Sequence, residues 1–262
     1  MSKVKIISGW SGPGGSTTVF INLTNYFNAK GLDCTFYGPQ NWHLDRCKSG
    51  TLSDLSFEED DVLICHYIDL VQRPKVKKVL FACHEKWWFD FSKIVSFWDK
   101  VIFLHKEHRD YHSNYQGSFS IIPNIKEELH PRDKSELDLV AGVIGAIEDR
   151  KQTHVSIERA IDDGCEKVLL FGNIQDHKYY NEMVQPLITN GKVINMGYAN
   201  SKQEMYDSVG RVYHSSKGEV ACLVKDECFS TGTKFFGNEE TDNTVSDFSN
   251  EKIFSLWKEE LS

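Results

Sequence analysis

Two glutamates stand eight positions apart in the segment EVACLVKDECFSTG, which runs from Glu219 to Gly232. An α-helix turns once per 3.6 residues, so eight positions are a little over two turns. If the segment is helical, Glu219 and Glu227 point to nearly the same face, where two carboxylates can accept hydrogen bonds from sugar hydroxyls. The same spacing arises by chance on solvated helix surfaces, so the surrounding sequence has to support this interpretation.

A cationic loop is the second candidate. In VIGAIEDRKQ, Gly145 is followed by Arg150 and Lys151. Glycine lets a backbone approach a ligand closely because it has no Cβ, and cations in such a loop can neutralise a phosphate group. A charged loop ahead of an amphipathic helix explains the segment equally well when it is taken alone.

A glycine-rich loop, GPGGS, contains Gly14 and Gly15 and follows the first apolar run. It lacks the lysine of a Walker A loop and the third glycine of a dinucleotide-binding fingerprint. We expect a loop whose N–H groups can come close to a sugar or an acceptor. An ordinary tight turn is the alternative.

Three apolar runs each end at a histidine, namely His66, His84 and His105. A lone histidine at a strand end is more often structural than catalytic. We find no metal-ligand spacing, such as His-x3-His, that would join these three into a metal site. The chain has seven cysteines without a CxxC pair, and we assign none of them to a metal or a disulfide.

The elements that must position these residues alternate between strands and helices. Helices are indicated by an amphipathic run from Ser16 to Gly31, by the capping box SKQE and by the closing segment NEKIFSLWKEEL. The apolar runs that predict strands are 4–9, 34–38, 61–66, 77–84, 99–105, 120–124, 138–146, 167–172, 192–197, 211–216 and 233–237. We therefore predict an α/β protein with two Rossmann-like doubly wound domains facing a cleft, residues 1–132 and 133–262, joined at PRDKSELD. Open α/β sheets bind ligands at the carboxyl ends of their strands.

Composition narrows the class of protein. The net charge is −8, with 16 Lys and Arg against 15 Asp and Glu in residues 1–132, and 14 against 23 in residues 133–262. The acidic second half disfavours broad nucleic-acid binding, whereas the first half, with lysines at 75, 77 and 78, could approach a polyanion. We expect no membrane insertion, no secretion signal and a cytoplasmic location.

Several segments together resemble retaining glycosyltransferases of the GT-B type, especially family 4. EVACLVKDECFSTGTKFFG resembles their Glu-x7-Glu region, and VIGAIEDRKQ resembles their phosphate-binding segment. WSGPGGSTTVF resembles the amino-terminal GGS loop, KKVLFACH the strand that ends in a functional histidine, and SIIPNI the PN motif before the interdomain linker. The matches occur in the family's order and cover nearly the whole chain.

The resemblance implies a transferase that moves a sugar from a nucleotide-sugar donor to an acceptor hydroxyl with retention at the anomeric carbon. It implies that Glu227 binds the ribose, that Glu219 lies near the donor sugar and that Lys151 neutralises the departing diphosphate. It also implies that His84 contacts the donor sugar or its leaving phosphate. We expect a UDP-sugar as co-substrate and neither a cofactor nor a metal. A hydroxymethylated base in phage DNA is one candidate acceptor, because compact enzymes of this type resemble those of phages.

Two alternatives stay open at this point. Ala146 stands where the family usually has arginine, which favours a non-catalytic protein of the same fold that binds a nucleotide sugar or a partner. The aromatic residues Trp87, Trp88 and Phe89 would form either a stacking platform for an acceptor or a plug between the domains.

Overall fold

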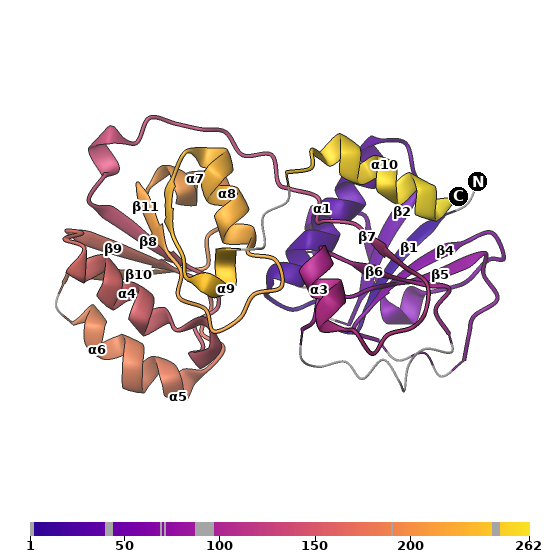
Figure 1. The fold of residues 1–262 in the computed structure, drawn as a ribbon, viewed down its shortest axis with the longest axis horizontal. Helices are drawn as coiled ribbons and strands as arrows, with labels where there is room; N and C mark the ends of the chain where they lie inside the picture. The colour runs from indigo at the N-terminus through magenta and orange to yellow at the C-terminus, as the bar shows by residue number, and fades with distance from the viewer. Residues whose placement is uncertain are drawn as a thin grey trace. The chain divides into compact units, whose positions relative to one another are not determined.

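The computed structural model describes residues 3–39, 44–68, 70, 72–86, 97–189, 191–242 and 247–262, which form two compact units (Figure 1). The first unit comprises Met1–Lys126 with Ser246–Ser262, and the second comprises Glu127–Val245. This division differs from the expected one in two respects. It falls at Lys126, and the closing segment of the chain belongs to the first unit.

The first unit contains a sheet of seven parallel strands in the order β3-β2-β1-β4-β5-β6-β7. Both central strands are buried at every position, as in a sheet covered on both faces. The chain order reverses between β1 and β4, so the loops at their carboxyl ends flank the position where such sheets bind ligands. The strands are β1 (Val4–Ser8), β2 (Cys34–Gly38), β3 (Ser49–Thr51), β4 (Val62–His66), β5 (Lys78–Ala82), β6 (Lys100–Phe103) and β7 (Phe119–Ile121).

The last helix completes the core of the first unit. Helices α1 (Gly15–Ala29) and α10 (Asn250–Leu261) lie side by side in Figure 1. The apolar face of α10 places Ile253 and Trp257 in the same buried cluster as Phe27 of α1. At the exposed edge of this contact, Tyr26 donates a hydrogen bond of 3.0 Å to Glu251. This packing explains why α10 belongs to the first unit although 119 residues of the second unit precede it.

The second unit contains a sheet of five parallel strands in the order β10-β9-β8-β11-β12. Here the chain order reverses between β8 and β11. The strands are β8 (Val140–Ile144), β9 (Lys167–Phe171), β10 (Val193–Gly197), β11 (Arg211–Tyr213) and β12 (Lys234–Phe236).

Short helices connect these strands. Among the described residues the remaining α-helices are α3 (Lys106–Tyr111), α4 (Thr153–Asp162), α5 (His177–Tyr179), α6 (Gln185–Ile188), α7 (Lys202–Asp207), α8 (Leu223–Thr231) and α9 (Glu239–Asp242). The 3₁₀ turns are η1 (Leu44–Arg46), η2 (Leu52–Asp54), η3 (Ser135–Leu137) and η4 (Asp149–Lys151), and η5 (Tyr180–Val184) is a π-helical segment between α5 and α6. In the part of the chain that the structure describes, no helix combines the length and the apolar character needed to span a membrane.

Candidate functional site

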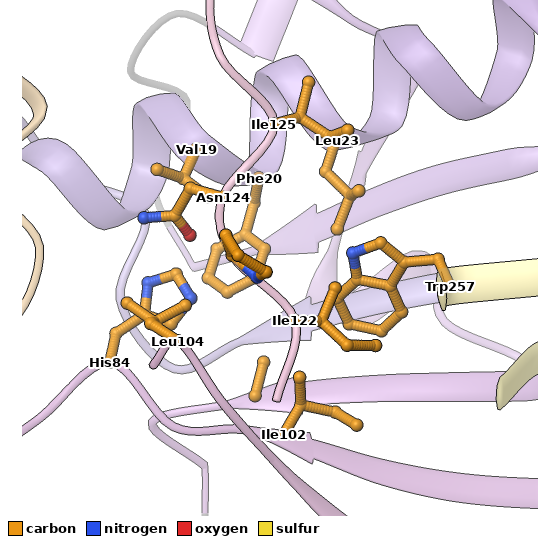
Figure 2. Close-up of a pocket in the computed structure, with 12 residues that line it drawn as sticks. Val19, Phe20, Leu23, His84, Ile102, Leu104, Ile122, Asn124, Ile125 and Trp257 are labelled. Carbon is orange, nitrogen blue, oxygen red and sulfur yellow. The ribbon is translucent and has the colours of Figure 1, made fainter. Parts of the chain in front are cut away.

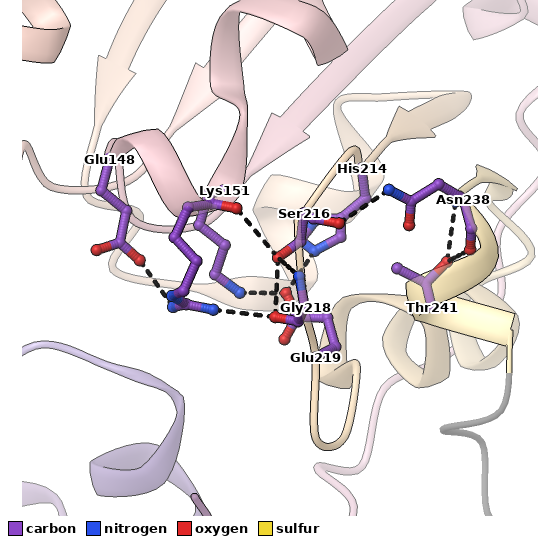
Figure 3. A network of polar contacts seen from close by, with 9 residues as sticks. Glu148, Lys151, His214, Ser216, Gly218, Glu219, Asn238 and Thr241 are labelled. Carbon is purple, nitrogen blue, oxygen red and sulfur yellow. Dashed lines mark hydrogen bonds and ion pairs between the residues drawn. The ribbon is translucent and has the colours of Figure 1, made fainter. Parts of the chain in front are cut away.

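Lys151 and Glu219 meet across the point where the order of the second sheet reverses. Lys151 ends the η4 turn after β8, and Glu219 lies in the loop after β11. Their side chains form an ion pair, and the same Glu219 oxygen accepts a hydrogen bond of 2.9 Å from Nε2 of His214 (Figure 3). The side chain of Glu219 is 9% exposed, and this burial opposes its ionisation. The charge of Lys151 and the hydrogen bond from His214 outweigh the effect of burial and hold the pKa of Glu219 well below the usual value. Glu219 is therefore a carboxylate at neutral pH.

The two loops are tied together around this pair (Figure 3). Arg150 donates hydrogen bonds to the Gly218 carbonyl at 3.1 Å and to Glu148 at 2.7 Å. The backbone N–H of Lys217 donates to the Arg150 carbonyl at 2.9 Å, and the Ser216 hydroxyl donates to the Gly218 carbonyl at 3.0 Å. Arg150 thus holds the Glu219 loop in place, while its side chain stays 45% exposed.

The glutamates do not share one helix, so that expectation is wrong. Glu227 lies within α8, but Cys222 is the residue that precedes the helix and Glu219 lies in the loop before it. In that loop Glu219 contacts Lys151 and His214. Burial, followed by the charges of Glu219 and Glu227, raises the pKa of the Cys222 thiol between them in the sequence to about 12.

Glu227 is 9% exposed and already has partners at both carboxylate oxygens. One oxygen pairs with the ammonium of Lys202, and the other accepts a hydrogen bond of 2.7 Å from the Tyr206 hydroxyl. Lys202 also lies 3.0 Å from Glu127. Burial disfavours the charge of Lys202, but the carboxylates of Glu227 and Glu127 outweigh it and raise its pKa. A carboxylate offers about four lone-pair positions, so Glu227 can accept further hydrogen bonds.

Gly145 combines an unusual backbone conformation with open space. Its φ is +138°, a backbone conformation that residues with a side chain rarely adopt. Apart from Gly145 itself and its two chain neighbours, no described atom lies within 4 Å of the position that a Cβ would take. Beside it, a Cβ on Gly172 would lie 1.8 Å from the Gly145 carbonyl oxygen. The two glycines therefore let the ends of β8 and β9 approach and leave the Gly145 backbone open to a ligand.

The glycine-rich loop of the first unit follows β1, beside the reversal of the first sheet. Gly14 immediately precedes α1, and Gly15 is its first residue. The Thr17 hydroxyl donates a hydrogen bond of 2.7 Å to the Gly12 carbonyl and so fixes the loop against the helix. The loop therefore delivers the amino-terminal end of a long helix to the ligand-binding edge of the sheet.

His84 lines a small pocket of the first unit, with a volume of about 10 Å³ (Figure 2). Its ring stacks on Phe20 at 4.9 Å, and Figure 2 shows it with Asn124 at one end of the pocket and Trp257 at the other. Burial, followed by the neighbouring His66, lowers the pKa of His84 to about 3, so the ring is neutral at pH 7. The pocket is lined by Val19, Phe20, Leu23, Ala82, His84, Ile102, Leu104, Ile122, Pro123, Asn124, Ile125 and Trp257.

The other two strand-end histidines have structural contacts. His66 is buried between the Ser8 hydroxyl and the Glu85 carboxylate, each at 2.8 Å. His105 accepts a hydrogen bond from the N–H of His108 and caps α3. The sequence analysis did not single out Glu85, although it is the polar residue directly after His84. Trp87, Trp88 and Phe89 lie outside the described residues.

Comparison with known proteins gives matches at the level of structure. No family model matches the chain, and no curated protein matches it. The chain superposes on HepE of Anabaena in complex with UDP-glucose with a TM-score of 0.71, at 10% identity, over 98% of this chain and 89% of that one. It superposes on WaaG, a glycosyltransferase involved in lipopolysaccharide biosynthesis, with a TM-score of 0.61, at 12% identity over 98% and 90% of the two chains.

A third neighbour is the lipopolysaccharide outer core galactosyltransferase WaaB, with a TM-score of 0.58 at 14% identity over 97% and 88% of the two chains. Structural neighbours of the chain, HepE and WaaG among them, are glycosyltransferases of the GT-B type. The chain has the GT-B fold. The predicted fold class of two parallel-sheet, Rossmann-like units is thereby confirmed, whereas the assignment to the retaining family 4 stays a prediction.

Proposed function

We propose that this chain is a glycosyltransferase that moves a sugar from a UDP-sugar to an acceptor hydroxyl. The observation that carries the proposal is the Lys151–Glu219 pair at the reversal point of the second sheet. The fold supports it, because the structural neighbour HepE was solved in complex with UDP-glucose and with UDP. The second unit binds the nucleotide sugar, and the first unit binds the acceptor.

In this scheme each residue acts on a charge or a hydroxyl. The ammonium of Lys151 neutralises the diphosphate that leaves, and the open backbone at Gly145 lets the phosphates approach. Glu227 accepts hydrogen bonds from the ribose hydroxyls, and Glu219 binds the donor sugar. The neutral ring of His84 contacts the sugar or its phosphate by hydrogen bonding, without a charge of its own.

The reaction forms a bond between the acceptor oxygen and the anomeric carbon, breaks the bond from that carbon to UDP and releases the proton of the acceptor hydroxyl. The rate comes from positioning and from stabilising the diphosphate. Retention of the anomeric configuration rests on the family resemblance, and NMR of the product tests it.

The first experiment measures binding and turnover together. UDP, GDP and ADP sugars are titrated calorimetrically, and the release of free nucleotide is followed for the wild type, Lys151→Met and Glu227→Gln. Lys234→Met is the matched control, because Lys234 is an exposed lysine of the same unit that pairs with Asp138. We expect the wild type and the control to bind a UDP-sugar with similar affinity. The two site variants should bind it at least about tenfold more weakly. Failure of every nucleotide sugar to bind would refute the proposal.

A non-catalytic protein that binds a nucleotide sugar is the second candidate, since Ala146 stands at the family's arginine position and Arg150 is engaged with Gly218 and Glu148. Binding without nucleotide release, with every acceptor offered, would favour this candidate.

A modified DNA base stays a prediction for the acceptor. Two of the lysines that could meet DNA are already engaged, because Lys77 and Lys78 donate hydrogen bonds to carbonyls of α10. Transfer to DNA should fall steeply as salt rises, and a rate independent of salt would argue for an uncharged acceptor.

A further inference from the structure

A cluster of soft ligands lies in the first unit, apart from the carboxylates and lysines described above. Cys83 follows β5, His108 lies in α3 and His112 ends that helix. All three side chains are buried, at 0%, 3% and 4% exposure. The Cys83 sulfur lies 3.5 Å from Nε2 of His108 and 3.9 Å from Nε2 of His112, and the three atoms lie within 4.8 Å of one another. The two histidines are four residues apart, a His-x3-His spacing that the sequence analysis overlooked.

These distances are close to those of a tetrahedral zinc site. Zinc binds nitrogen at about 2.0–2.1 Å and sulfur at about 2.3 Å, so two ligands of one tetrahedron lie roughly 3.3–3.6 Å apart. The carbonyl oxygen of Glu85 adjoins all three atoms at hydrogen-bond distance, and it would form the fourth corner after moving outward by about 0.5 Å. It lies 2.9 Å from Nε2 of His108, 2.8 Å from Nε2 of His112 and 3.5 Å from the Cys83 sulfur.

Hydrogen bonds alone account poorly for the convergence of these three groups on one carbonyl oxygen. Two imidazole nitrogens and a thiol all converge on the one Glu85 carbonyl, which has two lone pairs. A cation among the four atoms would use every one of them as a ligand.

We propose that the chain binds one zinc-type divalent ion through the Cys83 thiolate and the Nε2 atoms of His108 and His112, with the Glu85 carbonyl as the fourth ligand. A thiolate with two imidazoles is a donor set that suits zinc. Because the three side chains are buried and the fourth position is filled by backbone, the site is closed, which is typical of a structural ion. The ion would fix the residues on both sides of His84 to helix α3.

Binding requires three proton changes, at Cys83, His108 and His112, because a carbonyl only accepts and both Nε2 atoms therefore carry a proton when they bond to Glu85. The buried Cys83 thiol loses its proton to the solvent when the metal binds. The Leu104 N–H donates to Nδ1 of His108 at 3.3 Å, which places the ring proton on Nε2. Coordination through Nε2 moves that proton to Nδ1 and breaks the long contact with Leu104. The Leu104 amide resonance should therefore shift on metal binding.

The test uses the whole chain, freed of metal with a chelator and then titrated with Zn²⁺ or Co²⁺ alone. We expect one ion per chain, a sulfur-to-cobalt charge-transfer absorption and a rise in the melting temperature. Cys83→Ser should abolish the absorption and weaken zinc binding at least about 100-fold, and His112→Ala should weaken zinc binding similarly. Cys65→Ser is the matched control, because Cys65 is an equally buried thiol of the same unit outside the cluster.

The wild-type titration alone decides the proposal if a variant fails to fold. Cobalt that binds without the charge-transfer absorption, or zinc that leaves the Leu104 amide and the melting temperature unchanged, would overturn it. An absorption that persists in Cys83→Ser and disappears in Cys65→Ser would overturn the assignment of the ligands.

Discussion

The Lys151–Glu219 pair should stabilise the second unit through a buried, ionised carboxylate, and Glu219→Gln tests this directly. The substitution keeps the shape of the side chain but leaves the ammonium of Lys151, 18% exposed, and the buried ring of His214 without their anionic partner. Removing one partner of a fully buried ion pair costs about 3–5 kcal/mol. Since Lys151 retains some contact with water, we expect about 2–3 kcal/mol here. Adding Lys151→Met to the Glu219→Gln variant should recover part of the lost stability. The double-mutant cycle should give a coupling energy between the two residues of about 1–3 kcal/mol.

The pH dependence follows from the lowered pKa of Glu219. A carboxyl whose folded pKa is depressed contributes its full stabilisation above its unfolded pKa, about 4.3, and loses it as the pH falls toward the folded value. The difference in stability between wild type and Glu219→Gln should therefore be smaller at pH 3 than at pH 7, by about 2 kcal/mol. Asp149→Asn is the control, because the exposed Asp149–Lys217 pair joins the same two loops and its loss should change the stability by less than about 1 kcal/mol.

Urea unfolding followed by two probes provides the assay. All six tryptophans of the sequence lie within the ranges of the first unit, so tryptophan fluorescence follows that unit and far-UV circular dichroism follows both. The Glu219→Gln effect should appear in the dichroism transition and leave the fluorescence transition in place, unless the two units unfold together. A change below about 0.5 kcal/mol, or a difference that is the same at both pH values, would refute a buried carboxylate at Glu219.

Three further results are expected. Tyr206→Phe removes a 2.7 Å hydrogen bond to the Glu227 carboxylate and should lower the free energy of unfolding by about 1.5–3 kcal/mol in urea titrations; no loss would mean that water takes the place of the phenol. Gly172→Ala places a Cβ 1.8 Å from the Gly145 carbonyl, so we expect a lower melting temperature of the second unit by circular dichroism, and an unchanged one would contradict the close approach. The His84 ring should stay neutral between pH 5 and 8 in an NMR titration. Because its folded pKa lies below the unfolded one, its contribution to stability is complete above about pH 6.5 and falls as the pH drops; a midpoint near 6.5 would show that the ring is solvated.

The regular elements could be predicted because their signals are local. The apolar run CTFYG coincides with β2, and the closing amphipathic segment begins and ends at the same residues as α10. Ser201 caps α7 by accepting a hydrogen bond from the Glu204 N–H, as the SKQE segment indicates. Burial on both faces and helix capping are properties of neighbouring residues in the chain, so a single sequence contains them.

What could not be predicted depends on residues far apart in the sequence. The place of α10 in the first unit is set by its packing against Phe27. Likewise, Glu219 lies in a loop where it pairs with Lys151, 68 positions earlier, and nothing in the local segment reveals this partner. The Cys83–His108–His112 cluster joins residues 25 and 29 positions apart, of which only the His-x3-His half is visible in the sequence.

The existing pairs constrain how a nucleotide sugar would enter the second unit. On the proposed function, a diphosphate approaches Lys151 while the Glu219 carboxylate is already bound to it, and two anions then share one cation. An ammonium has three N–H donors, and Glu219 takes one of them, so the phosphates can bind without breaking the pair. The negative charge of Glu219 still repels them, and Glu219 offsets this only if its remaining lone pairs accept hydrogen bonds from sugar hydroxyls. The substitution Glu219→Gln should therefore increase the affinity for UDP alone more than the affinity for UDP-glucose. Equal changes for both ligands would show that Glu219 does not bind the sugar.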